Sequence, residues 1–146
     1  MSENLDLVRS IYAEPIRLEP YDPTWPSRFE DERAALTAAI GDWVVGGIHH
    51  VGSTAVTGMQ AKPVIDILVG VEELDASRAC FGRLTAAGYT YAPYRVDEMH
   101  WFSSLVRSDV RTTCTWCRST RRDTATSWRS ATTFGHTPTW PRTMPR

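Results

Sequence analysis

A glycine-serine turn, followed thirteen positions later by an acidic residue, is the feature of this chain best suited to phosphate chemistry. Gly52, Ser53 and Thr54 follow one apolar run, and Asp66 lies inside a second apolar run, Val-Ile-Asp-Ile-Leu-Val. Glycine permits a close turn, and the amides of a helical turn capped by Ser or Thr can hold phosphate oxygens. A carboxylate among apolar residues must be paired, protonated or bound to a cation. We therefore expect a phosphate-binding loop beside a divalent metal, such as Mg²⁺, with Asp66 as its ligand.

Three further side chains near these runs could contribute to such a site, and each also has an ordinary structural role. Lys62 precedes the second run and could neutralise phosphate charge during catalysis, or it could simply lead into a strand. His50, beside His49, directly precedes the turn and could contact phosphate, although a half-buried, hydrogen-bonded imidazole is the alternative. His100, further along, could reach the nucleotide or pack between strands.

Hydrophobic periodicity predicts the elements that position these residues. The short β-branched runs 44–51 and 64–71 predict strands, and an apolar stripe over 25–40 predicts a helix whose acidic opening turns, Glu30 to Glu32, face solvent. A second helix is expected over 72–87, ending at Gly88, and a hairpin is expected from aromatic runs at 89–91 and 99–102. The alternation at 16–18 suggests a short edge strand. The fold class is α/β (α+β), with a mixed sheet and flanking helices.

Composition limits the class of protein. A chain of 146 residues fits one domain, and a net charge of −1 argues against a dedicated nucleic-acid binder, since such domains are usually basic. No apolar stretch approaches membrane-spanning length, so we expect a cytoplasmic protein. The three cysteines suggest no disulfide framework.

The chain changes character near residue 103. Residues 1–102 carry 15 acidic and 8 basic side chains, whereas residues 103–146 carry 2 acidic and 8 basic ones. Beyond Val110 there is no Ile, Leu or Val. A segment with so few apolar side chains cannot offset its conformational entropy, so 103–146 is expected to be an atypical, poorly ordered tail. Its Trp and Arg residues could bind nucleic acid, and Cys114 and Cys117 could serve redox or zinc chemistry, but neither pattern is complete.

The chain resembles the GrpB family, which is nucleotidyltransferase-like. The resemblance covers residues 18–102 and rests on four motifs: Tyr21-Asp22-Pro23-Thr24-Trp25-Pro26, His50-Val51-Gly52-Ser53-Thr54-Ala55-Val56, Lys62-Pro63-Val64-Ile65-Asp66-Ile67-Leu68-Val69 and His100-Trp101-Phe102. It implies a GrpB-like nucleotidyltransferase-fold domain over 1–102. In the wider superfamily the glycine-serine loop holds a triphosphate and two strand carboxylates hold metals. Here the second carboxylate position is Leu68. The GrpB family itself usually shows only one acid in this strand. The resemblance also suggests a link to coenzyme A metabolism, because some bacteria fuse a GrpB-like domain to dephospho-coenzyme A kinase.

The segment Thr112 to Cys117 suggests that the reading frame has slipped. Starting at the last base of the Arg111 codon, the neighbouring frame can be read, with permitted third bases, as His-His-Leu-His-Leu-Val. That reading is similar to the histidine-bearing strand of the GrpB family, and the same frame then permits a helix. We therefore hypothesise a frameshift between about Ser103 and Arg111.

These observations lead to one function and one alternative. We expect a nucleotidyltransferase that binds nucleotide phosphates or another phosphate-bearing small molecule together with a divalent metal. If the family's metal ligands include the histidines of the later strand, this chain keeps Asp66, loses the others and has impaired activity. The frameshift would also remove a strand and a covering helix from the sheet. The alternative is a non-catalytic phosphate-binding or interaction module.

Overall fold

The computed structural model describes residues 6, 9, 13, 15–93 and 96–104, and the backbone of residues 111–118. Its helices are α2 (Trp25–Ile40), α3 (Leu74–Ser77) and α4 (Phe81–Ala86), and its strands are β1 (Val44–Val51), β2 (Val64–Val71), β3 (Tyr89–Ala92), β4 (Met99–Ser104) and β5 (Arg111–Arg118). The helix predicted at 25–40 and the strands predicted at 44–51 and 64–71 are confirmed with those bounds. None of the described helices is long and apolar enough to cross a membrane.

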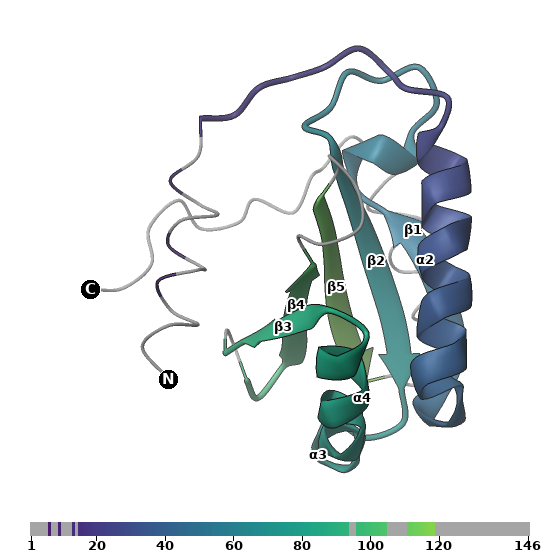
Figure 1. The fold of residues 1–146 in the computed structure, drawn as a ribbon, viewed down its shortest axis with the longest axis vertical. Helices are drawn as coiled ribbons and strands as arrows, with labels where there is room; N and C mark the ends of the chain where they lie inside the picture. Colours follow the sequence, from purple (N-terminus) through teal and green to yellow (C-terminus); the bar gives the residue numbers. More distant parts are fainter. Residues whose placement is uncertain are drawn as a thin grey trace.

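The five strands form one mixed sheet in the order β1-β2-β5-β4-β3 (Figure 1). β2 and β5 run parallel, while β1 pairs with β2, and β4 with both β3 and β5, in antiparallel fashion. The predicted hairpin is therefore present as β3 and β4. The mixed sheet with helices packed against it confirms the α/β fold class.

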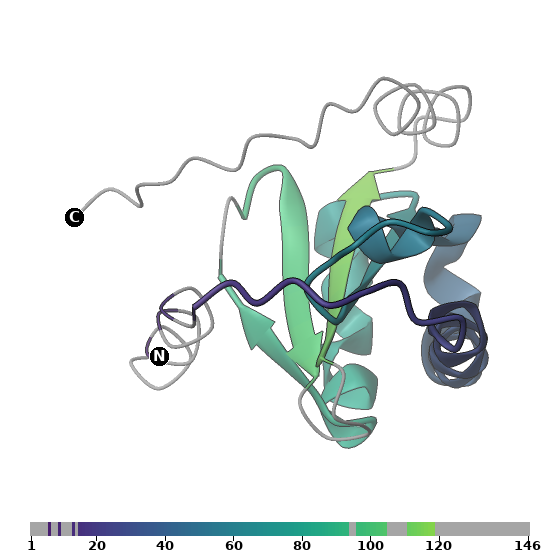
Figure 2. The same cartoon turned by 90° about the horizontal axis from the view of Figure 1, so that it is seen from above.

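Helices α2 and α4 cover one face of the sheet. The core on that face contains Ile65, Ile67 and Val69 from β2, together with Leu36 of α2 and Leu84 of α4. Figure 2 shows the arrangement from above, with α2, in dark blue, to one side of the strands. Because side chains alternate along a strand, the intervening residues of β2 belong to the opposite face. We call the first the helix face and the second the open face.

The helix predicted over 72–87 is present as three short segments. α3 is followed by a 3-10 turn over Arg78–Cys80 and then by α4. The Ser77 hydroxyl donates to the Leu74 carbonyl at 2.6 Å, and the Cys80 thiol donates to the Ser77 carbonyl at 2.8 Å. Such side chains compete for carbonyls that would otherwise accept helical bonds, which explains the interruption.

The boundary predicted at residue 102 needs correction. β4 continues to Ser104, and β5 occupies the centre of the sheet between β2 and β4. The prediction of a poorly ordered tail is wrong for residues 103, 104 and 111–118, as is the expected loss of a strand. Thr, Trp and Cys are compatible with strand backbone even where Ile, Leu and Val are lacking. Residues 119–146 lie outside the described part of the chain.

Two smaller expectations also need correction. The stretch at 16–18 forms no strand: the neighbouring Glu19 makes an isolated bridge to Ala61, and Ile16 and Leu18 are exposed. Within the acidic turns of α2, Glu30 and Asp31 are exposed as predicted, but Glu32 is buried. Its carboxyl group accepts a hydrogen bond from the Tyr89 hydroxyl.

Candidate functional site

The glycine of the turn and the acidic residue of β2 lie in direct contact. A Cβ atom added to Gly52 would lie 2.4 Å from Asp66 Oδ2. Gly52 has φ 76° and ψ −171°, a conformation that is essentially restricted to glycine. The chain can therefore turn against the carboxylate only because residue 52 has no side chain. The sequence predicted that the Gly52 turn and Asp66 would lie side by side.

Strand register explains why Asp66 lies beside the turn. Val51, the last residue of β1, pairs with Asp66, so Gly52 leaves the sheet next to that carboxylate. Asp66 is half-buried and lies on the open face, since its neighbours Ile65 and Ile67 enter the core beneath α2. The carboxylate is therefore placed at the β1–β2 end of the open face.

His50 and Thr54 are turned toward the helix face. His50 pairs with the core residue Ile67, and its ring stacks on Phe29 of α2 with centroids 4.9 Å apart. The Thr54 hydroxyl donates to the Val64 carbonyl at 2.8 Å and lies 3.0 Å from His50 Nε2. Since the single hydroxyl proton goes to Val64, Nε2 must be the donor in the second bond. These two side chains tie the loop to both strands.

The environment of His50 favours its neutral form. Burial lowers the pKa of this imidazole from its ordinary value, because a charged ring would be desolvated. A neutral imidazole whose Nε2 proton is already donated to Thr54 gives no positive charge to a phosphate. The arrangement therefore gives His50 a positioning role in the loop, which is the alternative that the sequence left open.

His100 lies away from Asp66. It is fully buried on the helix face, its Nε2 donates to the Leu74 carbonyl at 2.7 Å, and its ring meets Phe81 edge-on. Its register partner in β5 is Trp116, three positions beyond the partner of Asp66. The structure therefore does not bring His100 to the Gly52–Asp66 contact, and its surroundings match the packing alternative.

Ser53 and Lys62 flank the contact along the chain. Ser53 is half-buried and begins the one-turn 3-10 helix Ser53–Ala55. Lys62 is half-buried and stands just before β2, where the Val64 amide donates to the Lys62 carbonyl at 2.7 Å in a tight turn. Both residues lie near the end of the sheet at which Gly52 and Asp66 meet.

Asp66 is the side chain that the sequence predicts as a metal ligand. In the part of the chain that the structure describes, no three His, Cys, Asp or Glu side chains are grouped so as to hold a metal ion. These residues do not by themselves provide a closed metal site. Mg²⁺, however, is often bound by one or two carboxylates, with substrate phosphates and water completing its shell. A single carboxylate therefore fits a shared cation but no dedicated metal centre.

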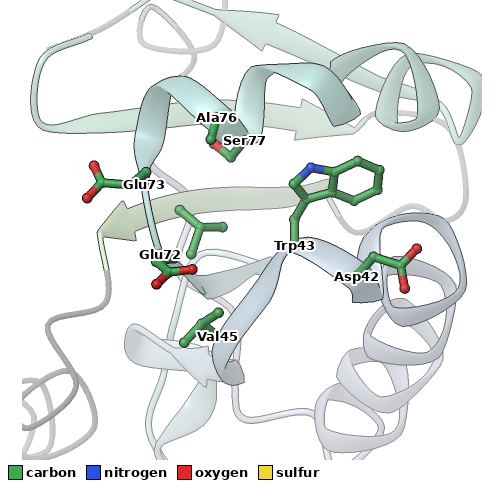
Figure 3. A pocket seen from close by; sticks show the side chains of 8 residues that line it. Asp42, Trp43, Val45, Glu72, Glu73, Ala76 and Ser77 are labelled. Atoms are coloured by element: carbon green, nitrogen blue, oxygen red, sulfur yellow. The ribbon is translucent and has the colours of Figure 1, made fainter.

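A cavity of about 160 Å³ lies at the other end of β2, lined in part by Asp42, Trp43, Glu72 and Glu73 (Figure 3). It contains none of the predicted site residues. The carboxylates of Asp42 and Glu73 point away from each other in Figure 3. These two acidic side chains therefore do not converge on a common cation. The guanidinium of Arg83 lies 4.9 Å from the centre of the Trp43 ring.

One residue of the open face was missed by the sequence analysis. Ser103 is 3% exposed, and its Oγ is without a hydrogen-bond partner among the described residues. The alternation of the aromatic run could have indicated its face, since Phe102 is a core residue and Ser103 follows it. A serine next to aromatic residues gave no chemical signal of its own.

Comparison with known proteins agrees with the fold. The family model described as GrpB protein matches residues 15–135. The UPF0157 protein BH1888 of Halalkalibacterium halodurans is 37% identical over 91 residues, covering 62% of this chain and 45% of that protein. A dephospho-CoA kinase of Mycobacterium bovis is 43% identical over 84 residues, covering 56% of this chain and 20% of that protein. The chain thus spans less than half the length of these relatives.

A solved structure supports the same assignment. The crystal structure of the conserved protein GrpB from Enterococcus faecalis superposes with a TM-score of 0.62 at 26% identity, covering 70% of this chain and 61% of that one. The nucleotidyltransferase-like fold expected from the resemblance is therefore present. Together with the family match over most of the sequence, this shows that the chain belongs to the GrpB family.

Proposed function

We propose that the chain binds the phosphates of a nucleotide at the Gly52–Asp66 contact, together with a divalent cation such as Mg²⁺. The observation that carries this proposal is the 2.4 Å approach of a Gly52 Cβ position to Asp66 Oδ2. Because residue 52 has no side chain, the loop lies directly against the carboxylate, and that carboxylate can share a cation with a phosphate held by the loop amides. Binding of phosphate without the cation would bring two negative groups together, so the cation is part of the proposal.

Ser53 and Lys62 supply the remaining interactions in this proposal. The Ser53 hydroxyl and the loop amides would contact phosphate oxygens, and Lys62 would balance their negative charge. His50 and Thr54 would act indirectly, because their mutual hydrogen bond holds the loop against β2.

Catalytic turnover is expected to be weak in this chain. A nucleotidyltransferase stabilises the charge of the transferred phosphoryl group with precisely held cations, and one carboxylate leaves most of a cation's shell to water. A phosphate-binding module without turnover is therefore the second candidate. The observation that favours it is that the described residues contain no group of three potential metal ligands.

The strand register supports a connection between the frameshift hypothesis and this site. Position 113 of β5 is the direct partner of Asp66, and position 115 is the partner of Leu68. With permitted third bases, and one base restored upstream, both positions can be read as histidine in the neighbouring frame. A chain made in that frame would thus carry histidines opposite Asp66 and two residues further on, and we propose that it binds divalent metal more tightly.

Thermal-shift titration of the full chain with ATP, with and without MgCl₂, tests the proposal. A ligand that binds only the folded state raises Tm, by the equivalent of about 2.7 kcal/mol at one hundred times its Kd. Asp66→Asn should remove the Mg²⁺-dependent part of the shift. Asp31→Asn is the matched control, because it removes the same charge from an exposed position on α2. Dephospho-coenzyme A serves as a second probe, in view of the kinase relative.

The results of this titration distinguish a nucleotide site with a shared cation from a phosphate-binding module without turnover. An ATP shift that requires both Mg²⁺ and Asp66 supports the shared cation, and release of pyrophosphate from ATP in the presence of acceptors would add turnover. A shift that persists in Asp66→Asn without Mg²⁺ supports the phosphate-binding module. If the wild-type chain shows no shift with either probe, the proposal is wrong.

A further inference from the structure

The segment 15–20, which leads toward α2, is exposed along its length and is held to the domain by a backbone bridge. The Glu19 amide donates to the Ala61 carbonyl at 2.9 Å, and the Ala61 amide donates to the Glu19 carbonyl at 3.0 Å. Ile16 is 78% exposed and Leu18 is 62% exposed, more than any other large apolar side chain of the described residues. Figure 1 shows the segment, in purple, as an open stretch of chain. It therefore presents two apolar side chains to solvent.

The backbone of this segment has one edge toward the domain and one edge toward solvent. In extended chain, the N–H and C=O groups of successive residues point to opposite sides. Those of Glu19 point to Ala61, so those of Leu18 and Ile16 point the other way. Neither of these two residues makes a backbone hydrogen bond to another described residue. Such an edge is a template for pairing with another chain.

The charges of the segment are complementary to themselves. When two copies pair in antiparallel fashion about Leu18, Arg17 of each copy lies opposite Glu19 of the other. These are non-hydrogen-bonded pairs, in which the side chains approach most closely, and opposite charges there stabilise the pairing. Arg17 and Glu19 are exposed, and neither forms an ion pair with another described residue. Both side chains are therefore available to a second copy.

Other registers of the same segment lack this match. Pairing about Arg17 would place two guanidinium groups opposite each other, and it would need the backbone groups on the side that faces Ala61. Pairing about Ile16 would place Arg17 opposite Pro15, which carries no charge. Charge and backbone direction thus select the register that is centred on Leu18.

We propose that two copies of the chain associate through segment 15–20, as an antiparallel strand pair with Leu18 at its two-fold axis. The apolar side chains of the two copies then cover one another on one face of the pair, and the ion pairs lie on the other face. Association stops at two copies, because the opposite edge of the segment is occupied by Ala61. This inference is independent of the proposed phosphate site.

The size of the contact predicts a weak dimer. A specific, stable interface buries at least roughly 1,200 Å² in total, more than two such short segments can bury. The loop that leads to Ala61 adds apolar surface, because Val56 is 36% exposed and Met59 is 45% exposed. Figures 1 and 2 both show this loop beside the segment. We therefore expect a dimer that forms at high protein concentration and dissociates on dilution.

Exchange of the two charged residues tests this register in the full chain. Sedimentation equilibrium over a range of protein concentrations gives the dissociation constant of the dimer. Arg17→Glu and Glu19→Arg each place like charges opposite each other twice, so each variant alone should dimerise about fourfold more weakly or worse. An equimolar mixture of the two variants should dimerise again, because acidic positions of one chain then face basic positions of the other. The double variant Arg17→Glu with Glu19→Arg should dimerise as wild type does.

Two further variants distinguish pairing of this segment from a general effect of charge. Asp31→Arg changes the charge by the same amount as Glu19→Arg, at an exposed position on α2, and should leave the dissociation constant unchanged. Leu18→Pro removes the N–H group at the two-fold axis and should abolish the dimer. Since Leu18 is exposed and its N–H group makes no bond to a described residue, the Tm of the dilute chain should stay the same.

Three results would overturn the inference. The first is a wild-type chain that stays monomeric at every concentration. The second is a dimer with the same dissociation constant in wild type, Arg17→Glu and Glu19→Arg, which must use another surface. The third is a mixture of these two variants that dimerises no better than either variant alone, because the segments then do not face each other.

Discussion

The Tyr89 hydroxyl donates a hydrogen bond to the buried carboxyl group of Glu32, and this contact joins β3 to α2. Tyr89 is 2% exposed and Glu32 is 8% exposed, so water cannot readily replace either partner. The acidic turns of α2 were expected to face solvent, and this one residue departs from that expectation. Its partner lies 57 positions along the chain, a separation that a local sequence pattern does not reveal.

Tyr89→Phe should therefore destabilise the fold. The substitution preserves the ring and leaves the Glu32 carboxyl group without this donor, which should lower the free energy of unfolding by about 1.5–3 kcal/mol. Urea unfolding followed by far-UV circular dichroism measures the change. Tyr91→Phe is the control, because Tyr91 is half-buried and packs against Phe81 through its ring. Equal losses in the two variants would show that the Glu32 hydrogen bond contributes little.

Gly52→Ala should be much more costly than Gly58→Ala. Both glycines have positive φ, 76° at Gly52 and 80° at Gly58. A Cβ at Gly58 meets nothing within 4 Å, whereas a Cβ at Gly52 overlaps Asp66 Oδ2. We expect a loss of about 1 kcal/mol for Gly58→Ala from backbone strain alone, and more than about 2 kcal/mol for Gly52→Ala.

The double variant Gly52→Ala with Asp66→Ala identifies the source of that excess. Removing the carboxylate removes the overlapping atoms, so part of the loss caused by Gly52→Ala should be recovered. Unfolding free energies that simply add would indicate that the two residues do not interact.

Stability should fall as pH drops below about 6.5. Burial lowers the pKa of His50 from its ordinary value of 6.5. Burial also lowers the pKa of His100, against the opposing effect of its hydrogen bond to the Leu74 carbonyl. A folded state with lowered histidine pKa values binds fewer protons than the unfolded chain, so its stability is complete above pH 6.5 and is lost at lower pH. Each histidine can contribute at most about 1.4 kcal/mol per pH unit.

Urea midpoints measured from pH 7.5 to pH 5 test this dependence. His100→Gln and His50→Gln keep a side-chain donor without a titrating ring, and each should flatten the profile. Hydrogen bonds with Thr24 lower the pKa of Asp22 from its ordinary value of 3.8. Protonation of this carboxyl group therefore affects stability only below the pH range of the titration. A profile with the same slope in wild type and both variants would contradict the assignment to these histidines.

Resequencing of the gene and intact-mass measurement of the protein test the frameshift hypothesis. If the frame slips between Ser103 and Arg111, resequencing of the gene will show an inserted or deleted base there. If one missing base is restored and the third bases are those that the hypothesis requires, a chain produced from the corrected gene will contain histidines at positions 112, 113 and 115. Intact-mass measurement of the native protein distinguishes the two chains. An uninterrupted frame together with the mass of the 146-residue sequence would remove the hypothesis.

The strands and the long helix could be predicted because their patterns are local. The run Val64 to Val71 is β-branched and bounded by Pro63, and α2 has its apolar stripe and a stop at Gly41. The contact of Gly52 with Asp66 followed from the same patterns, because two antiparallel strands joined by one loop place the end of the first beside the start of the second. The positions of His100 and Ser103 could not be predicted, since they depend on which strand neighbours β4.

The residues of β5 were predicted to belong to a poorly ordered tail, and the error has a related physical reason. Its eight residues lack Ile, Leu and Val, and composition alone favours an unstructured segment. In the structure its backbone pairs on both sides, with β2 and with β4, so the surrounding sheet determines its conformation. This is a case of tertiary context overriding intrinsic preference.

The strand order has a consequence for how the protein is made on the ribosome. β1 with β2 and β3 with β4 are neighbours in the chain and can pair as soon as they emerge, but the two hairpins share no edge. Within the described sheet, backbone pairing joins them only after residues 111–118 have left the exit tunnel and paired with both β2 and β4. Closure of the sheet is therefore a late, long-range event, and nascent chains that stall before residue 111 will expose two unpaired strand edges to chaperones and proteases.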